Sequence, residues 1–287
     1  MAIATKPASN CIAVVFDFDD TLVPDTVDSL LESCGIDSDT FRQERIQPLV
    51  EQGWDKILAR FYALIEESQQ DSQHKITKDS LAKFGQQLSP FEGVTEMFDR
   101  LRQRAHELNP DVELEFYLIT CGMVEIARHN CIAPYFKAMW GCEFHYGEDG
   151  GVDFLKKIVT HTEKTRYLFQ ISKGIEHHKD DGQMFVYRDI APEELHVPLN
   201  QVIYVGDGAS DIPCFSVLNQ EEGIALGVYK DQTPEEWSEV ANISQSQRVA
   251  NLAPADYRED SELLQSLMLA VERMCKQIAL HQLSVGE

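Results

Sequence analysis

The sequence predicts an α/β fold with a doubly wound, mainly parallel sheet and an inserted block of helices. Beyond residue 94, short apolar segments rich in β-branched and aromatic residues alternate with segments whose apolar residues recur at helical spacing. Residues 24–88 show helical spacing only, and they follow a single strand-like segment. Such alternation indicates parallel strands covered by helices on both faces, with the helical block inserted after the first strand.

Length and composition agree with this class. The chain has 287 residues, 43% of them hydrophobic, which is enough for a large core domain and a smaller companion. It carries 48 Asp and Glu against 25 Lys and Arg, a formal net charge of -23. The field of such a protein repels phosphate backbones and anionic lipids, so we expect neither nucleic acid nor a membrane surface as a partner. No feature predicts the oligomeric state.

The apolar segments of the sequence bear on the expected cellular location. No apolar run approaches the roughly 20 residues that span a bilayer, and no signal-peptide core precedes the first strand. We therefore expect a cytoplasmic protein. The seven cysteines form no CxxC pair and are expected to be reduced core thiols. Cys121 adjoins a candidate site residue, but no neighbouring feature supplies an activating base, so a catalytic thiol is not favoured.

The first third of the chain is expected to be one strand followed by helices. The run CIAVVF predicts a strand over residues 11–16. Helical stripes then follow, the first from Val27 to Cys34 and the last around Leu81, Phe84 and Leu88. Between them, one apolar helical face is expected from Trp54, Ile57, Leu58, Phe61, Tyr62 and Ile65. We therefore predict a core domain of residues 1–23 and 89–287, with a helical cap domain of residues 24–88 over the strand ends.

The remaining elements continue the alternation. Helices are expected over 94–108 and roughly 123–130, and strands over 114–120, 138–144, 201–205 and 223–229. Residues 147–151 predict a turn between two extended segments, and residues 175–183 predict an exposed polar loop. A terminal apolar stripe from Leu263 to Ile278 predicts a helix that closes the core.

Acidic and hydroxyl side chains end three of the expected strands. FDFDDT places Asp17, Asp19 and Asp20 after the first, LIT ends the second in Thr120, and GDGASD places Asp207 and Asp211 after the third. Because parallel strands present their carboxyl ends at one edge, we expect these groups to share a crevice. Clustered carboxylates repel one another, and a bound Mg²⁺, which prefers such hard oxygen ligands, would relieve that repulsion.

The same residues suggest a chemistry. With a metal present, Asp17 is the best-placed nucleophile toward phosphorus. Asp19 can protonate a leaving oxygen and later take a proton from water. The Thr120 hydroxyl and backbone N–H groups of the following turn, at Gly122, can hold phosphoryl oxygens, and a lysine can offset the remaining charge.

On these motifs the chain resembles phosphatases of the haloacid dehalogenase (HAD) superfamily, in particular the phosphoserine phosphatase-like branch. The first motif of that family, DxDxT, matches Asp17, Asp19 and Thr21; the second matches Thr120, and the fourth matches Asp207 and Asp211. For the third, a lysine, we choose Lys164, with Lys173, Lys157 and Lys156 as competitors. The resemblance implies a helical cap of the first type at residues 24–88, and Mg²⁺ held by Asp17, the backbone carbonyl of Asp19, Asp207 and Asp211.

The resemblance implies a Mg²⁺-dependent phosphomonoester hydrolase acting on a small phosphorylated metabolite through an aspartyl-phosphate. A phosphotransferase or phosphomutase with the same site, or a non-catalytic protein that binds a phosphorylated ligand, remains open. An EF-hand is excluded because its sixth and twelfth positions from Asp17 are Leu22 and Asp28. GDGASD lacks the third glycine of a dinucleotide fingerprint. His177 and His178 are read as part of a polar loop, and Arg42, Arg45 and Arg60 are candidate anion-binding residues of the cap.

Overall fold

A seven-stranded sheet forms the centre of the molecule, which is described by a computed structural model for residues 9–70, 72–174, 186–230 and 249–285. The strand order is β4-β3-β2-β1-β5-β6-β7. Neighbouring strands pair in parallel, except that β3 and β4 pair antiparallel. The strands are β1 Cys11–Phe16, β2 Glu113–Met123, β3 Ala138–Tyr146, β4 Val152–Lys157, β5 Val202–Gly206, β6 Ile224–Tyr229 and β7 Asn251–Pro254. The predicted mainly parallel sheet is confirmed.

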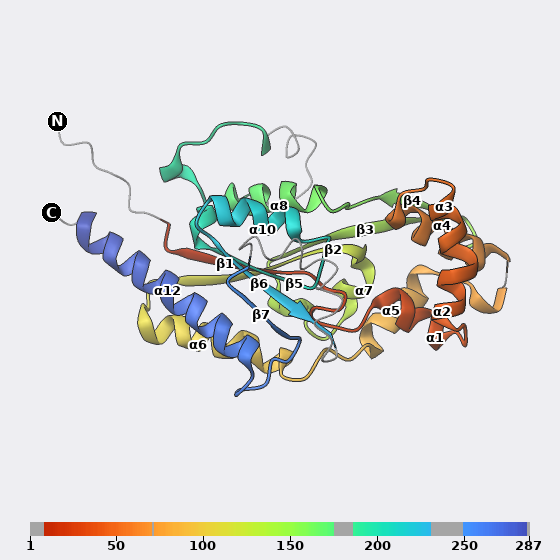
Figure 1. Ribbon diagram of the computed structural model, residues 1–287, viewed down its shortest axis with the longest axis horizontal. Coiled ribbons are helices and arrows are strands. Elements are labelled where there is room, and N and C mark those ends of the chain that lie inside the picture. Colours follow the sequence, from red (N-terminus) through yellow and green to blue (C-terminus); the bar gives the residue numbers. More distant parts are fainter. Residues whose placement is uncertain (1–8, 71, 175–185, 231–248, 286–287) are drawn as a thin grey trace.

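Helices cover both faces of this sheet. Helices α6 (Val94–Leu108) and α12 (Glu262–Val285) pack together on one face, and α8 (Glu163–Ser172) and α10 (Ile212–Gln220) pack together on the other (Figure 1). All six residues of β1 are buried between these layers. A strand that is buried on both faces needs the continuous apolar run CIAVVF, so the doubly wound core follows directly from the sequence pattern.

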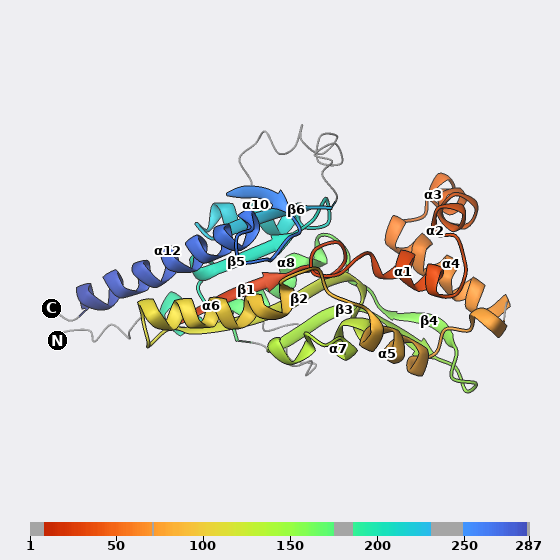
Figure 2. The ribbon, with the colours of Figure 1, turned by 90° about the horizontal axis from the view of Figure 1, so that it is seen from below.

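The inserted helices lie mainly beyond the sheet edge at which β1 ends (Figures 1 and 2). They are α1 (Thr26–Ser33), α2 (Ser38–Phe41), a π-helical turn (Arg42–Ile46), α3 (Gln47–Glu51), α4 (Lys56–Gln70), a 3-10 turn (Ser72–His74) and α5 (Lys78–Gln87). Helix α5 packs instead against α7 (Val124–His129) of the α/β layer. There the Asn130 amide donates to the Gly85 and Leu88 carbonyls at 3.0 and 2.7 Å.

The β3–β4 hairpin carries the sheet outward to meet α4. Its Phe144 ring lies edge-on to the Phe61 ring of α4, with centroids 5.4 Å apart. The Val152 N–H donates to the Ile76 carbonyl at 2.9 Å. At the tip, the Gly147 N–H donates to the Gly151 carbonyl at 2.8 Å, which confirms the predicted turn. The hairpin therefore supports the inserted helices from one side.

Three expectations differ from the structure. Strand β2 continues beyond the predicted end at Thr120, and β7 was not predicted because four residues carry too weak a period. The single apolar face predicted for residues 54–65 is wrong. Phe61 and Ile65 of α4 are buried. Leu58 and Tyr62 of α4 are exposed, as is Trp54 just before this helix, because the three recur every four residues along another side.

Among helices formed by the described residues, we find none with the length and hydropathy that a membrane crossing requires. The predicted polar loop at 175–183, with His177 and His178, lies outside the described residues.

A buried carboxylate joins three segments at the amino end of the sheet. Glu115 of β2 accepts a hydrogen bond from the Tyr117 hydroxyl at 2.5 Å, pairs with the Lys137 ammonium, and lies 2.8 Å from Nε2 of His196. Burial alone would raise the pKa of Glu115, but the contacts with His196, Lys137 and Tyr117 outweigh it and lower the pKa to about 2.

This network predicts an acid-dependent contribution to stability. A carboxyl whose folded pKa is depressed stabilises the fold above its unfolded pKa, and it loses that contribution as the pH falls toward the folded value. We expect Glu115→Gln to lower the free energy of unfolding by about 2 kcal/mol at pH 7. The difference from wild type should shrink between about pH 4.5 and pH 2. Urea unfolding at several pH values measures this, and a difference that stays constant with pH would contradict it.

Candidate active site

Side chains from the ends of several strands meet at the carboxyl edge of the sheet, as predicted. Asp17 directly follows β1, Asp207 follows β5, and Thr120 lies near the end of strand β2. They line a cavity of about 240 Å³ together with residues of α4. The Asp17 N–H donates to the Val205 carbonyl at 2.9 Å, which fixes the end of β1 beside β5.

Lys164, the lysine chosen from the sequence, lies fully buried at the start of α8. Its ammonium is 2.7 Å from Oδ2 of Asp17 and 2.7 Å from Oδ1 of Asp211, and 3.1 Å from the Ser210 hydroxyl. A buried ammonium is stable only when it is paired, and here two carboxylates supply that pairing. Lys164 thus lies within contact of the first and fourth sequence motifs.

The competing lysines lie elsewhere. Lys173 donates to the backbone carbonyls of Val186 and Arg188. Lys156 and Lys157 lie 3.2 and 3.8 Å from the carboxylate of Glu143 on the β3–β4 hairpin.

The cluster holds more negative charge than Lys164 balances. Carboxylate oxygens of Asp17, Asp207 and Asp211 lie within 4.8 Å of one another. Burial raises the pKa of Asp17 to about 7, although the Lys164 ammonium opposes the shift. Burial and the neighbouring charge of Asp17 also raise the pKa of Asp207 well above its ordinary value. These carboxylates repel one another when they are ionised together. Hard oxygen donors grouped in this way fit a divalent cation such as Mg²⁺.

Asp211 also contacts groups outside the three carboxylates of this cluster. Its Oδ1 accepts hydrogen bonds from the Lys164 ammonium and from the Tyr204 hydroxyl at 2.8 Å. Its Oδ2 accepts a longer bond, 3.4 Å, from the Gly208 N–H. A Cβ on Gly206 would come within 2.4 Å of the Asp211 carboxyl carbon. Asp211 therefore fixes both the lysine and the loop that carries Asp207.

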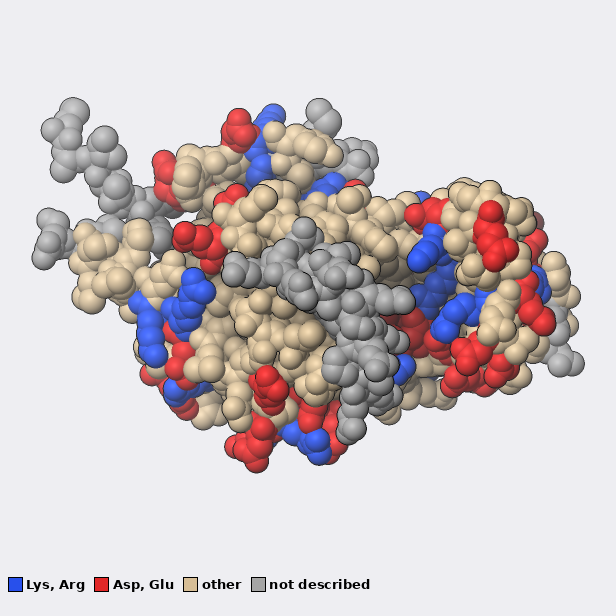
Figure 3. Space-filling model, viewed as in Figure 1, with Lys and Arg blue, Asp and Glu red and all other residues tan. Residues whose placement is uncertain are grey.

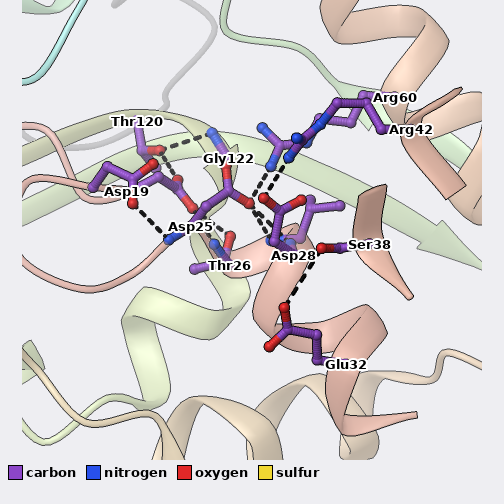
Figure 4. Close-up of polar contacts among 12 residues, drawn as sticks. Asp19, Asp25, Thr26, Asp28, Glu32, Ser38, Arg42, Arg60, Thr120 and Gly122 are labelled. Atoms are coloured by element: carbon purple, nitrogen blue, oxygen red, sulfur yellow. Dashed lines mark hydrogen bonds and ion pairs between the residues drawn. The ribbon is translucent and has the colours of Figure 1, made fainter. Parts of the chain in front are cut away.

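Asp19 is held by partners from both sides of the cavity (Figure 4). Its Oδ1 accepts from the N–H and the hydroxyl of Thr26, at 2.8 and 2.5 Å. Its Oδ2 accepts from the Thr120 hydroxyl at 2.9 Å, and that hydroxyl oxygen accepts from the Gly122 N–H at 2.7 Å. Burial and the charge of Asp25 raise the pKa of Asp19, whereas Arg60 and the Thr26 hydrogen bonds act to lower it.

A shift in strand register between Ile119 and Met123 brings Gly122 against Asp19. A Cβ at Gly122 would come within 2.1 Å of Oδ2 of Asp19. Thr26 and Thr120 hold this carboxylate by hydrogen bonds. The Asp19 side chain could therefore make room for a Cβ at residue 122 only by breaking those bonds. Register shifts of this kind are common beside active sites, where they re-aim side chains.

For the phosphomonoester hydrolysis that the sequence motifs lead us to expect, Gly122→Ala should displace Asp19 and lower kcat by about 100-fold, within the range that general acid–base catalysis contributes. Thermal unfolding should remain cooperative, because the displaced group lies at a cavity wall. Gly150→Ala is the matched control. That glycine lies on the hairpin tip with no atom near its would-be Cβ, but its φ of +76° means that Ala adds local strain there without touching the site. Full activity of Gly122→Ala would contradict the assigned close approach.

Asp20 lies on the cavity, but its carboxylate has partners in the turn. It accepts from the Asp25 N–H at 3.0 Å and lies 3.3 Å from the Lys230 ammonium. Its φ of 51° is left-handed, a conformation that aspartate tolerates better than most residues. This agrees with its interpretation as a turn residue.

The inserted helices contribute the opposite wall. Lys56, Ile57 and Arg60 of α4 line the cavity with Asp25, and the Arg60 guanidinium pairs with the Asp25 carboxylate. Basic side chains gather where the core meets these helices (Figure 3). Of the three candidate cap arginines, Arg60 alone is among the residues that line this cavity. Arg42 pairs with Asp28 and Asp39, and Arg45 pairs with Glu66 and Glu67.

Sequence reasoning missed several residues of the site. Ser210 lies inside the GDGASD motif and could have been considered with it. Thr26 follows an aspartate at an expected helix start, which is a recognisable capping pattern. His161 lines the cavity and Tyr204 donates to Asp211, but neither residue carries a local sequence signal for the site. Cys121 lines the cavity, and burial raises the pKa of its thiol.

Comparison with known proteins gives one sequence relative and several structural ones. No family model matches the chain. A Borreliella burgdorferi protein described as uncharacterized is 26% identical over 295 residues, covering 93% of this chain and 97% of its own. A HAD family hydrolase from Salmonella enterica serovar Typhi has a TM-score of 0.59 at 13% identity, covering 92% of this chain and 72% of the other.

Two further structures are named as phosphoserine phosphatases. A substrate-bound phosphoserine phosphatase has a TM-score of 0.55 at 16% identity, covering 90% of this chain and 97% of its own. A probable phosphoserine phosphatase from Vibrio cholerae has a TM-score of 0.54 at 12% identity, covering 95% and 68%. These likenesses agree with the resemblance found in the motifs. The chain has the fold of the HAD family hydrolases and phosphoserine phosphatases.

Proposed function

We propose that this protein is a Mg²⁺-dependent phosphomonoester hydrolase that acts on a small phosphorylated metabolite through an aspartyl-phosphate on Asp17. The observation that carries the proposal is the shared cavity. Asp17, buried against Lys164, lies beside Asp207, and Asp19 faces the same space with Thr120. The fold likeness to phosphoserine phosphatases supports the same reaction class.

The reaction requires two displacements at phosphorus. In the first, an Asp17 oxygen forms a bond to phosphorus while the bond to the leaving oxygen breaks, and Asp19 gives that oxygen a proton. In the second, water attacks phosphorus, Asp19 takes the proton of the water, and the bond to Asp17 breaks. Phosphate is released, and both aspartates return to their starting states.

The phosphoryl oxygens need donors in both steps. The Thr120 hydroxyl and the Gly122 N–H lie on one side of the cavity, where they donate to Asp19 and to Thr120 and would exchange these partners for phosphoryl oxygens. The Lys164 ammonium lies on the other side. Preorganised donors of this kind stabilise the charge that develops on the transferring group. These groups are assigned to phosphoryl binding on that ground.

The metal would be held by Asp17, Asp207 and the backbone carbonyl of Asp19, with Asp211 adjoining. When bound, Mg²⁺ neutralises negative charge on the carboxylates and on the phosphoryl group, which eases the approach of two anions. The surplus of buried carboxylate beside a single ammonium supports this assignment.

Two substrate limits follow from the cavity. Its volume of about 240 Å³ suits a small phosphate ester, and the α4 wall of Lys56, Ile57 and Arg60 covers the alcohol portion. Exclusion of bulk water by that wall would protect the aspartyl-phosphate.

The direct test is hydrolysis of p-nitrophenyl phosphate by the purified protein in water labelled with oxygen-18. We expect turnover with Mg²⁺, loss of turnover with EDTA, and one labelled oxygen in the released phosphate. Phosphate appearing on an added alcohol, without label, would indicate a phosphotransferase. Tight phosphate binding without turnover would indicate a non-catalytic protein.

A metal-ligand variant sharpens the test. Asp207→Asn is expected to raise the Mg²⁺ concentration needed for half-maximal activity by at least about 10-fold, because a neutral amide is a weaker ligand for a hard cation. Asp256→Asn is the control, since that carboxylate pairs with Arg258 at 2.6 Å. An unchanged Mg²⁺ requirement in Asp207→Asn would contradict its assignment as a ligand.

A further inference from the structure

The carboxylate of Asp19 is oriented by two parts of the fold at once. Thr120, on the core strand β2, donates to Oδ2. Thr26, the first residue of α1, donates to Oδ1 through both its backbone N–H and its hydroxyl. Thr26 is fully buried, and Figure 4 shows it facing Asp19 from the helical side of the cavity. The inserted helices therefore supply two of the three donors to this carboxylate.

Helix capping does not account for the Thr26 hydroxyl. The N-cap of α1 is Asp25, whose carboxylate accepts from the N–H groups of Val27 and Asp28 at 2.9 and 3.0 Å. A threonine at the next position has no capping role left to perform. The N–H and the hydroxyl of Thr26 both donate to Asp19, which lies outside the helix.

The position of Thr26 depends in turn on the assembly of the inserted helices. Asp25 pairs with Arg60 of α4, and its N–H donates to Asp20. Helix α4 packs against the β3–β4 hairpin through Phe61 and Phe144. The first turn of α1 is thereby tied to α4, to the hairpin and to the turn after β1.

We infer that Thr26 is a positioning residue for catalysis, so that the inserted helices as well as the core orient the acid and base of the reaction. This inference rests on the proposed role of Asp19. On the far side of Oδ2, Gly122 offers no side chain to hold the carboxylate. When the Thr120 hydroxyl turns to a phosphoryl oxygen, Thr26 is the remaining donor to Asp19 among the three named above. Without the Thr26 hydroxyl, the Thr26 N–H alone holds the carboxyl, which can then rotate into the cavity. Asp19 then delivers its proton less effectively in the first reaction step. The rate should fall most for substrates whose leaving oxygen is strongly basic.

Two aryl phosphates separate orientation of the acid from general damage. Phenolate is a much stronger base than p-nitrophenolate, so phenyl phosphate depends more on proton donation than p-nitrophenyl phosphate does. We would measure single-turnover release of each leaving group with enzyme in excess. Thr26→Val, which is close in shape, is expected to slow phenyl phosphate cleavage by on the order of 10-fold, the effect of one lost hydrogen bond. Cleavage of p-nitrophenyl phosphate should change by less than about 3-fold, and the enzyme concentration that gives half the maximal rate should be unchanged for both substrates.

Thr26→Ser restores the hydroxyl and should restore phenyl phosphate cleavage. Thr77→Val is the matched control, because Thr77 caps α5 with its side chain and lies outside the residues that line the cavity. It should affect both substrates equally or neither. If Thr26→Val does not fold, Thr26→Ala replaces it in the same comparison.

The outcomes separate this inference from the proposed function. Equal slowing of both substrates, no slowing, or failure of Thr26→Ser to restore the rate would overturn the role of Thr26. Wild-type protein that cleaves neither substrate, or an Asp19→Asn variant with the wild-type ratio of the two rates, would overturn the proposed function instead.

Discussion

Replacement of Asp17 by Asn is expected to abolish phosphomonoester hydrolysis, with a fall in kcat of at least about 10⁴-fold, as expected when a covalent nucleophile is removed. An amide cannot form the phosphoryl bond, and it is also a poorer partner for the metal and for Lys164, which lies 2.7 Å from Oδ2. Residual hydrolysis of p-nitrophenyl phosphate, measured with Mg²⁺ in excess, tests this.

Asp20→Asn provides the comparison within the same motif. Asp20 is acidic and lines the same cavity, but its carboxylate bonds to the Asp25 N–H and to Lys230. We expect its kcat to stay within about 10-fold of wild type, the effect of weakening one turn contact. Equal losses in the two variants would mean that local charge, and not nucleophilic attack by Asp17, controls the rate.

Replacement of Lys164 by Met is expected to lower the free energy of unfolding, and to lower it further as the pH rises. It leaves Asp17 and Asp211 buried without their shared cation, so the free energy of unfolding at pH 7 should fall by about 3–5 kcal/mol. The loss should grow with pH. Without the ammonium, burial favours the protonated form of Asp17 in the folded state, whereas the unfolded chain releases that proton above about pH 4. Folding therefore becomes less favourable as the pH rises. Urea titrations at pH 5 and pH 8 measure both effects.

Lys156→Met is the control for this prediction, because Lys156 is 56% exposed and pairs with Glu143 on the hairpin surface. Its stability should change by less than about 1 kcal/mol, as for a surface ion pair. A Lys164→Met variant that is as stable as the control and retains turnover would contradict the placement of this lysine between two carboxylates.

The core of the fold was predictable because its strands are buried on both faces. Cys11–Phe16 and Val94–Leu108 agree with the expected bounds, since a continuous apolar run and a helical stripe each leave a clear pattern. The burial predicted for Trp54, Leu58 and Tyr62 is wrong, because spacing indicates that apolar residues share a helix but not which of its sides meets a partner. The contact of Trp54 with Tyr62, with ring centroids 4.7 Å apart, gives part of that surface a local partner.

The site was predictable as far as it lies on local motifs. Asp17, Asp19, Thr120 and Asp207 come from strand ends, where topology requires convergence. Its place at an expected helix start favours Lys164 among four lysines of the sequence, and the structure brings its ammonium to Asp17. Arg60 is one of three cap arginines that the sequence offers, and only the tertiary structure selects it. The contacts of Thr26 with Asp19 and of Tyr204 with Asp211 likewise needed the structure. Their partners are distant or fall on an element whose packing direction the sequence does not encode.

The central claim, that Asp17 carries the phosphoryl group, is tested most directly in the Asp19→Asn variant. With p-nitrophenyl phosphate the first step needs little proton donation, while the second lacks its base, so the intermediate should accumulate. After a rapid acid quench, tandem mass spectrometry should place one phosphoryl group on Asp17, and hydroxylamine should remove it. A phosphoryl group on any other residue, or release of p-nitrophenolate with no protein-bound phosphoryl group, would contradict the mechanism.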